Sequence, residues 1–149
     1  MGDRLFGPEV GYGAEVVKAF LIVADAARTH PDGTFSLLRG GITSVTTEET
    51  KPAVLKASVV ARITLEPGEG GPHAFKIAIV NEDGASVAPD FTGSFEAASK
   101  GGNVNLVMDL QLIFPKPGRY AFNLFVDNRI EHSWGMEVVA KPPEQGAGE

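Results

Sequence analysis

The stretch from Asn103 to Ala140 restricts the fold more than any other, because its apolar residues occupy every second position through two successive segments. Side chains at alternate positions of a β-strand point to the same face, so this period predicts strands with one buried face. A short run, Pro115-Lys116-Pro117-Gly118, separates the first segment from the second, which resumes at Tyr120. We therefore predict that the two segments form an antiparallel hairpin with one face on the core.

Two further segments carry the assignment toward the N-terminus. Leu55 to Leu65 alternates as regularly as the C-terminal segments. Glu15 to Ala27 is ambiguous, because its Ala, Glu, Lys and Leu residues favour a helix whereas its Val and Ile residues favour a strand. We choose a strand, since the turn signal His30-Pro31-Asp32-Gly33 follows it and Thr34 to Leu38 has the right length to return as its partner. Apolar residues on both sides of Phe20 to Ala24 predict a central or doubly covered strand.

The remaining segments are short and separated by turn signals. Ile42 to Thr47 is β-branched and is expected to cross from one sheet toward the other. Phe75 to Ile79 begins a strand that turns at Asn81-Glu82-Asp83-Gly84, and Pro89 in the returning segment indicates an edge position or a break. The tally of about eight or nine strands predicts an all-β protein, a two-layer antiparallel β-sandwich of the Ig-like or jelly-roll-like kind. We favour a sandwich over a small barrel, because several strands are apolar on one face only.

The length of 149 residues is that of one domain. Residues 1–13 and 141–149 are rich in glycine and proline and show no apolar period, so we expect a flexible arm and a disordered tail around a sandwich domain at 14–140.

Composition excludes several functional classes. The chain has no cysteine, which excludes disulfides, a thiolate nucleophile and a cysteine zinc site. The net charge of −6 and the lack of a Lys/Arg cluster disfavour nucleic acid as a partner. The most apolar run, around Phe20 to Ala24, is too short for a membrane-spanning helix, so no membrane partner is expected. The first residues lack a basic region followed by an apolar one, which indicates a cytoplasmic protein.

Motifs for catalysis and metal binding are missing from the sequence. The three histidines lie in or beside different turns, and none has the helical spacing of a two-histidine metal site. We find no nucleophile elbow, no phosphate-binding loop and no dinucleotide fingerprint. We therefore expect no catalytic residue, no metal and no cofactor.

Candidate binding residues near the first turn are Asp25, Arg28, His30 and Asp32. Asp25 continues an apolar strand and would need a cation if it were buried. We expect Asp25 and Arg28 to form a structural ion pair, with a ligand-gripping pair as the alternative. Carboxylates at strand ends can also form calcium sites, although turn formation already accounts for Asp32 beside Gly33.

A second candidate patch lies near the C-terminus and combines Arg129, His132 and Trp134, residue types that suit a recognition surface. Trp134 shares a two-residue period with Met136 and Val138, so packing in the core is its preferred role.

Several motifs resemble those of an uncharacterised family of small bacterial all-β proteins. The motifs are Val23-Ala24-Asp25-Ala26-Ala27-Arg28, the run from Asp32 to Gly41, the Asn81-Glu82-Asp83-Gly84 turn and Gly118-Arg119-Tyr120-Ala121-Phe122. The resemblance spans Ala19 to Val139 and implies the fold, with no activity to carry over.

The sequence thus favours a non-catalytic interaction or assembly module, which binds a protein partner or a second copy through loops or a strand edge. The apolar second face of Phe20 to Ala24 favours a homo-oligomer that covers it. The alternative is a small-ligand or carbohydrate-binding protein, with or without calcium, or a hydrolase, using one loop end around Asp25, Arg28, His30 and Asp32.

Overall fold

A computed structural model describes residues 18–48 and 51–141, and every element in this part of the chain is a β-strand. The all-β prediction is therefore confirmed. The predicted arm at 1–13 lies outside the described residues, as does the predicted tail except for Lys141, which ends the last strand. The strands are β1 Ala19–Thr29, β2 Phe35–Gly40, β3 Ser44–Glu48, β4 Ala53–Leu65, β5 Gly71–Asn81, β6 Phe91–Ala97, β7 Gly102–Phe114, β8 Gly118–Val126 and β9 Arg129–Lys141.

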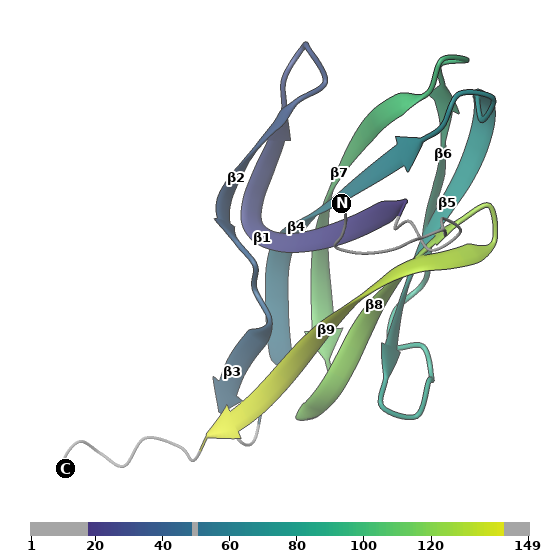
Figure 1. The fold of residues 1–149 in the computed structure, drawn as a ribbon. Helices are drawn as coiled ribbons and strands as arrows, with labels where there is room; N and C mark the ends of the chain where they lie inside the picture. Colours follow the sequence, from purple (N-terminus) through teal and green to yellow (C-terminus); the bar gives the residue numbers. More distant parts are fainter. Residues whose placement is uncertain (1–17, 49–50, 142–149) are drawn as a thin grey trace, which may run out of the picture.

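The strands form two facing sheets, which confirms the two-layer sandwich (Figure 1). The four-stranded sheet has the order β2-β1-β4-β7, and the five-stranded sheet has the order β3-β9-β8-β5-β6. The connection after β2 crosses between the sheets at Gly41 to Thr43. A crossing was expected in the β-branched segment from Ile42 to Thr47, whose later residues form β3 in the second sheet. All strand pairs are antiparallel except β3 with β9, which is parallel.

The core lies between the sheets and is built from the alternating positions. Phe114 and Phe122 are fully buried, together with Leu21, Val23, Val59, Ile63, Ile77, Ile79 and Leu124. Burying each side chain of this size contributes about 1.5–3 kcal/mol, so the core needs no metal or disulfide to close it.

The predicted hairpin between the two C-terminal segments is wrong. β7 pairs with β4 in the four-stranded sheet, whereas β8 pairs with β5 and β9 in the other sheet. The Pro115 to Pro117 linker therefore crosses between the layers, and the rings of Phe114 and Tyr120 meet in the core with centroids 4.6 Å apart. The real hairpin joins β8 to β9 through Asp127 and Asn128, which both have positive φ.

β1 is a central strand, as predicted, with β2 and β4 as neighbours. Phe20 and Ile22 on its outer side are half-buried within the chain itself. Pairing with β4 ends at Ala24, after which β1 and β2 continue as a projecting hairpin (Figure 1). The tip of this hairpin reaches back to β7, where the Asn105 amide donates a 2.9 Å hydrogen bond to the Gly33 carbonyl.

None of the described residues belongs to a helix of the length and hydropathy that crossing a membrane requires.

Candidate functional site

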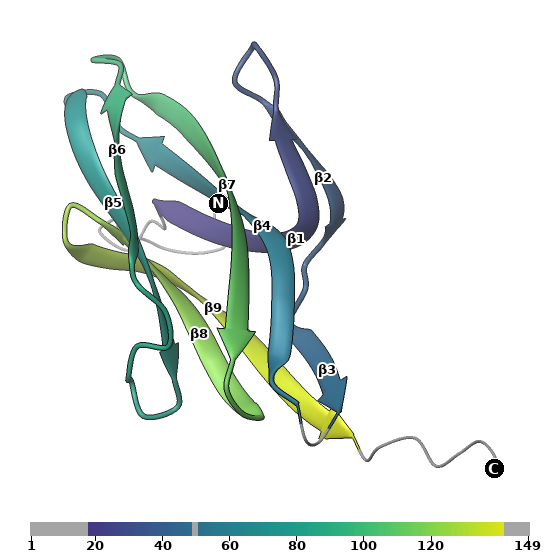
Figure 2. The same cartoon turned by 180° about the vertical axis from the view of Figure 1, so that it is seen from behind.

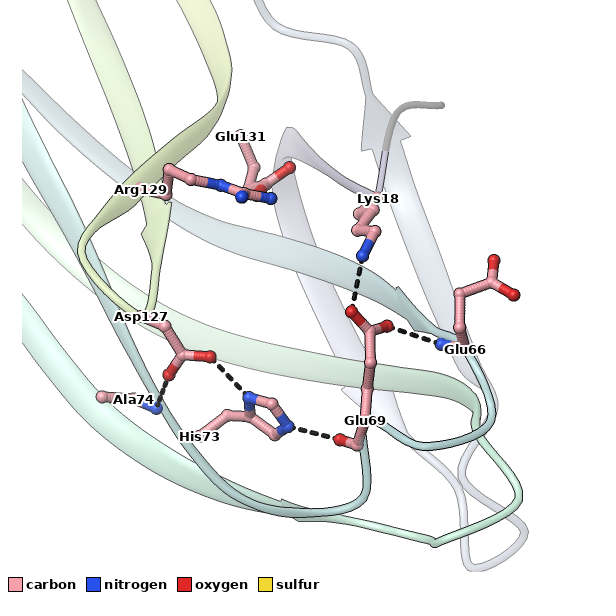
Figure 3. A network of polar contacts seen from close by, with 8 residues as sticks. All are labelled: Lys18, Glu66, Glu69, His73, Ala74, Asp127, Arg129 and Glu131. Atoms are coloured by element: carbon pink, nitrogen blue, oxygen red, sulfur yellow. Dashed lines mark hydrogen bonds and ion pairs between the residues drawn. The ribbon is translucent and has the colours of Figure 1, made fainter. Parts of the chain in front are cut away.

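One end of the sandwich carries a connected polar network centred on His73 of β5 (Figure 3). Its Nδ1 lies 2.6 Å from Oδ2 of Asp127, its Nε2 lies 2.6 Å from the backbone oxygen of Glu69, and its ring stacks on Phe95 at 5.4 Å. Carboxylate and carbonyl oxygens only accept hydrogen bonds, so this arrangement is satisfied when both ring nitrogens carry a proton, as in the imidazolium. The hydrogen bond to Asp127 is the main cause that raises the pKa of His73.

Asp127 holds the β8–β9 turn against the start of β5. Its Oδ1 accepts a hydrogen bond from the Ala74 N–H at 3.0 Å, and its own N–H donates to the Ala74 carbonyl at 2.8 Å. The hydrogen bond from His73, and then that from Ala74, lowers the pKa of the Asp127 carboxyl.

Glu69 extends the network to the chain segment before β1. Its carboxylate accepts the Glu66 N–H at 2.7 Å and pairs with Lys18 at 2.5 Å. These two contacts lower the pKa of Glu69, the Glu66 N–H most. A cavity of about 200 Å³ lies among these groups, and Arg129 and Glu131, paired at 3.3 Å, also line it.

The chemistry of this network is that of a structural clasp. His73 has no free ring nitrogen to accept a proton, because both are committed to acceptors. Glu69, Asp127 and Glu131 each face a cation of the same network. Over residues 18–48 and 51–141 no three His, Asp or Glu side chains gather in a group that could hold a metal ion.

The predicted ion pair of Asp25 with Arg28 is wrong. Arg39 of β2 pairs with Asp25 instead, with nitrogen-to-oxygen distances of 2.6 Å and 3.0 Å. Residues three apart on a strand point to opposite faces, whereas Arg39 lies across from Asp25 between the pairs Ala24↔Gly40 and Ala26↔Leu38. The hydrogen bonds from Arg39 lower the pKa of Asp25, which is exposed.

The other candidates near the first turn are spread along the hairpin. Asp32 accepts hydrogen bonds from the N–H and the hydroxyl of Thr34, and so shapes the turn. His30 contacts Ser36 at 2.7 Å and lines a shallow hollow together with Arg28. Asp25 lines a different hollow, between the hairpin and the β4–β7 pair. The four side chains do not share one cavity, so the ligand-binding alternative gains no support from geometry.

The C-terminal candidates mainly hold elements together. His132 Nδ1 accepts a 2.8 Å hydrogen bond from the Leu21 N–H, which ties β9 to β1. Trp134 packs against the core and donates from Nε1 to the Ile42 carbonyl at 2.8 Å, while Met136 is buried. The preferred role of Trp134 in packing thus agrees with its contacts. Arg129 lines the cavity described above.

A second feature of the sandwich is the free edge of β7 in the four-stranded sheet. β4 pairs with β7 along its whole length, from Gly102 to Phe114, and no other strand among the described residues pairs with it. This edge is 13 residues long and contains a single charged residue, Asp109, with no lysine, arginine or proline. Asp109 accepts a hydrogen bond from buried Ser58 on β4 at 2.6 Å.

The other three edge strands carry the protections that sheet proteins use against unwanted pairing. β2 has six residues and is kinked at Arg39, whose φ is 53°. β3 has five residues, and β6 has seven and follows Pro89. Short, irregular or proline-flanked edges pair poorly with another chain. β7 lacks all of these features.

The inner face of β7 is incompletely covered. Leu110, Leu112 and Phe114 are buried, whereas Val104, Leu106 and Met108 are half-buried. β7 and β6 are the edge strands of the two sheets on the same side of the sandwich (Figure 2). The sequence indicated a strand here but carried no signal that it is an edge, because a single charge over residues 102–114 is also ordinary in a central strand.

A comparison with protein families identifies the family of this chain. Residues 19–139 match the family of unknown function DUF6941, so the chain belongs to this family. The resemblance to an uncharacterised family is thereby confirmed. Among curated proteins no match is found.

Two solved structures are similar over part of their length. One is a protein inferred to be a β-galactosidase from Bacteroides fragilis, with 14% identity, a TM-score of 0.37 and coverage of 71% of this chain and 19% of that chain. The other is the alkylpurine DNA glycosylase AlkC of Pseudomonas fluorescens bound to DNA with an abasic site analog, with 12% identity, a TM-score of 0.37 and coverage of 83% and 31%. The chain therefore spans less than a third of either protein. At these TM-scores neither likeness carries an argument about fold or function.

Proposed function

We propose that this chain is a non-catalytic protein-interaction module that takes up an extended segment of a partner along the free edge of β7. The observation that carries this proposal is the contrast between the edges. Three are short or kinked, and the fourth is a regular strand of 13 residues with one charge. A strand edge of this kind offers a row of backbone N–H and C=O groups to a further strand.

The side chains of β7 define the chemistry of the partner segment. On the inner face the added strand would lie beside Val104, Leu106 and Met108, which are half-buried and gain further burial from an apolar neighbour. On the outer face it would lie beside Asn105, Val107 and Asp109. The matching partner is an extended segment with an apolar residue at every second position and uncharged or basic residues between them.

The polar network supports a binding role rather than a catalytic one. His73 and Asp127 resemble a proton-transfer pair, but both ring nitrogens of His73 are used in holding the Glu69 loop and the β8–β9 turn. A general base needs a nitrogen that can reach a substrate proton. The network therefore stiffens one end of the sandwich.

Photo-crosslinking in living cells of the native host tests the proposal. A benzophenone amino acid replaces Gln111, which is exposed on β7, and the matched control carries it at Thr92, which is exposed on the β6 edge. We expect position 111, and not position 92, to crosslink to an extended segment with alternating apolar residues. Crosslinks from both positions alike, or only from position 92, would contradict a binding role for β7.

A further inference from the structure

We infer that the strand taken up by β7 is the β7 of a second copy of this chain, paired antiparallel about Val107. This inference rests on the proposed function and names its partner. A two-fold axis through Val107 would join the two four-stranded sheets edge to edge. Both copies would contribute the same surface, because an interface with two-fold symmetry is formed by the same residues on each side.

The inner face of β7 matches itself in this register. Leu106 of one copy lies opposite Met108 of the other, and Val104 lies opposite Leu110. Leu106, Met108 and Val104 are half-buried in the single chain. Pairing would bring the incompletely covered side chains of both copies onto one side of a continuous sheet, where each covers the other.

The outer face favours Val107 over the centres that follow it along the strand. Here Val107 meets its own copy, and Asp109 lies opposite the amide residue Asn105. Pairing about Asp109 would set two carboxylates against each other, and pairing about Met108 would set Asp109 against Val107. Like charges directly opposite each other destabilise a strand pair, whereas a carboxylate beside an amide does not. With a single charge in each β7, the register about Val107 contains no unfavourable pair.

A charge swap at two exposed positions tests both the dimer and its register. In the proposed pairing Asn103 of one copy lies opposite Gln111 of the other, and both side chains are exposed, so substitution leaves the core intact. The variant N103K/Q111K sets lysine against lysine twice, and N103K/Q111E sets lysine against glutamate twice. We expect N103K/Q111E to dimerise about tenfold more tightly than N103K/Q111K, with the unsubstituted chain between them.

Sedimentation velocity at low salt measures the dissociation constants, and circular dichroism checks that all variants are folded. Overall charge works against the expected order, because N103K/Q111K lowers the magnitude of the net charge and should reduce general repulsion. The expected order therefore reports the register.

Two results would overturn the inference. One is a chain that remains a monomer at about 100 μM while position 111 crosslinks to another protein, in which case the proposed function stands and only the partner is different. The other is a dimer whose affinity is the same in both variants, which excludes pairing about Val107. If position 111 also gives no crosslink, the proposed function fails with it.

Discussion

Replacing His73 with glutamine should remove a pH-dependent part of the stability of this protein. His73 joins three elements, since it donates to Asp127 in the β8–β9 turn and to the Glu69 carbonyl before β5, and stacks on Phe95 of β6. Glutamine is of similar length but carries no positive charge, and its amide can donate to only one of the two acceptors in a good geometry.

The expected loss follows from the contacts and their exposure. A hydrogen bond to a charged group contributes about 1.5–3 kcal/mol when well shielded, and an exposed ion pair contributes about 0–1 kcal/mol. The His73 side chain is 15% exposed, whereas that of Asp127 is 52% exposed, so the contact lies between these limits. We expect H73Q to lower the free energy of unfolding by about 1–2 kcal/mol at slightly acid pH.

The sign of the pH dependence is set by the raised pKa of His73. The folded protein holds the proton more tightly than the unfolded chain, whose histidine pKa is near 6.5. The stabilisation is therefore complete below this pH and is lost as pH rises through the raised pKa. Urea unfolding followed by the fluorescence of the single Trp134 should show a larger free energy of unfolding for the unsubstituted chain than for H73Q, and this difference should shrink as pH rises above about 6.5.

His30 supplies the control for this experiment. Its ring contacts the hydroxyl of Ser36 at 2.7 Å, outside the polar network, so H30Q shows what replacing a histidine by glutamine does without breaking the His73 contacts. The difference in free energy of unfolding between the unsubstituted chain and each variant isolates the contribution of the histidine that is replaced. A constant or growing advantage over H73Q as pH rises would refute the imidazolium assignment.

Four substitutions test the backbone and the crossover. G101A should cost about 2–4 kcal/mol and G84A about 1 kcal/mol in urea unfolding, because both glycines have φ near +80° but only at Gly101 would a Cβ lie 2.5 Å from the Leu65 carbonyl oxygen. N128G should raise the free energy of unfolding by about 0.5–1 kcal/mol, since φ of Asn128 is 69° and glycine relieves the strain. Y120F should cost about 1 kcal/mol, because the Tyr120 hydroxyl donates to a backbone carbonyl of the crossover linker.

Alternation in the sequence identified the strands well, because burial on one face imposes it directly. β4 and β8 carry their buried residues at the predicted positions, and Asn81 to Gly84 forms the predicted turn. Alternation does not identify the neighbouring strand. Leu110 to Phe114 and the apolar residues of β8 point into the same core whether the linker makes a hairpin or crosses between layers, so the hairpin prediction failed there.

The polar network could not be predicted either, because it depends on which strands are neighbours. His73 and Asp127 are 54 residues apart in sequence and meet only because β5 and β8 are neighbours. Asp25 shows the local form of this problem, since Arg28 is closer in sequence but Arg39 lies across the hairpin. Ion pairs on strands follow strand register, which the sequence does not contain in readable form.

The position of β7 at an edge gives its amphipathic pattern a second meaning. In a central strand, one charged residue among 13 is ordinary, because the strands on both sides pair with its backbone N–H and C=O groups. At an edge the same pattern leaves regular backbone groups open beside half-buried Leu106 and Met108. A lysine on this strand that met no carboxylate of the added strand would have discouraged pairing, and the exposed positions Asn103 and Gln111 could have held one without disturbing the core. The uncharged residues at these positions are therefore compatible with an edge that is used.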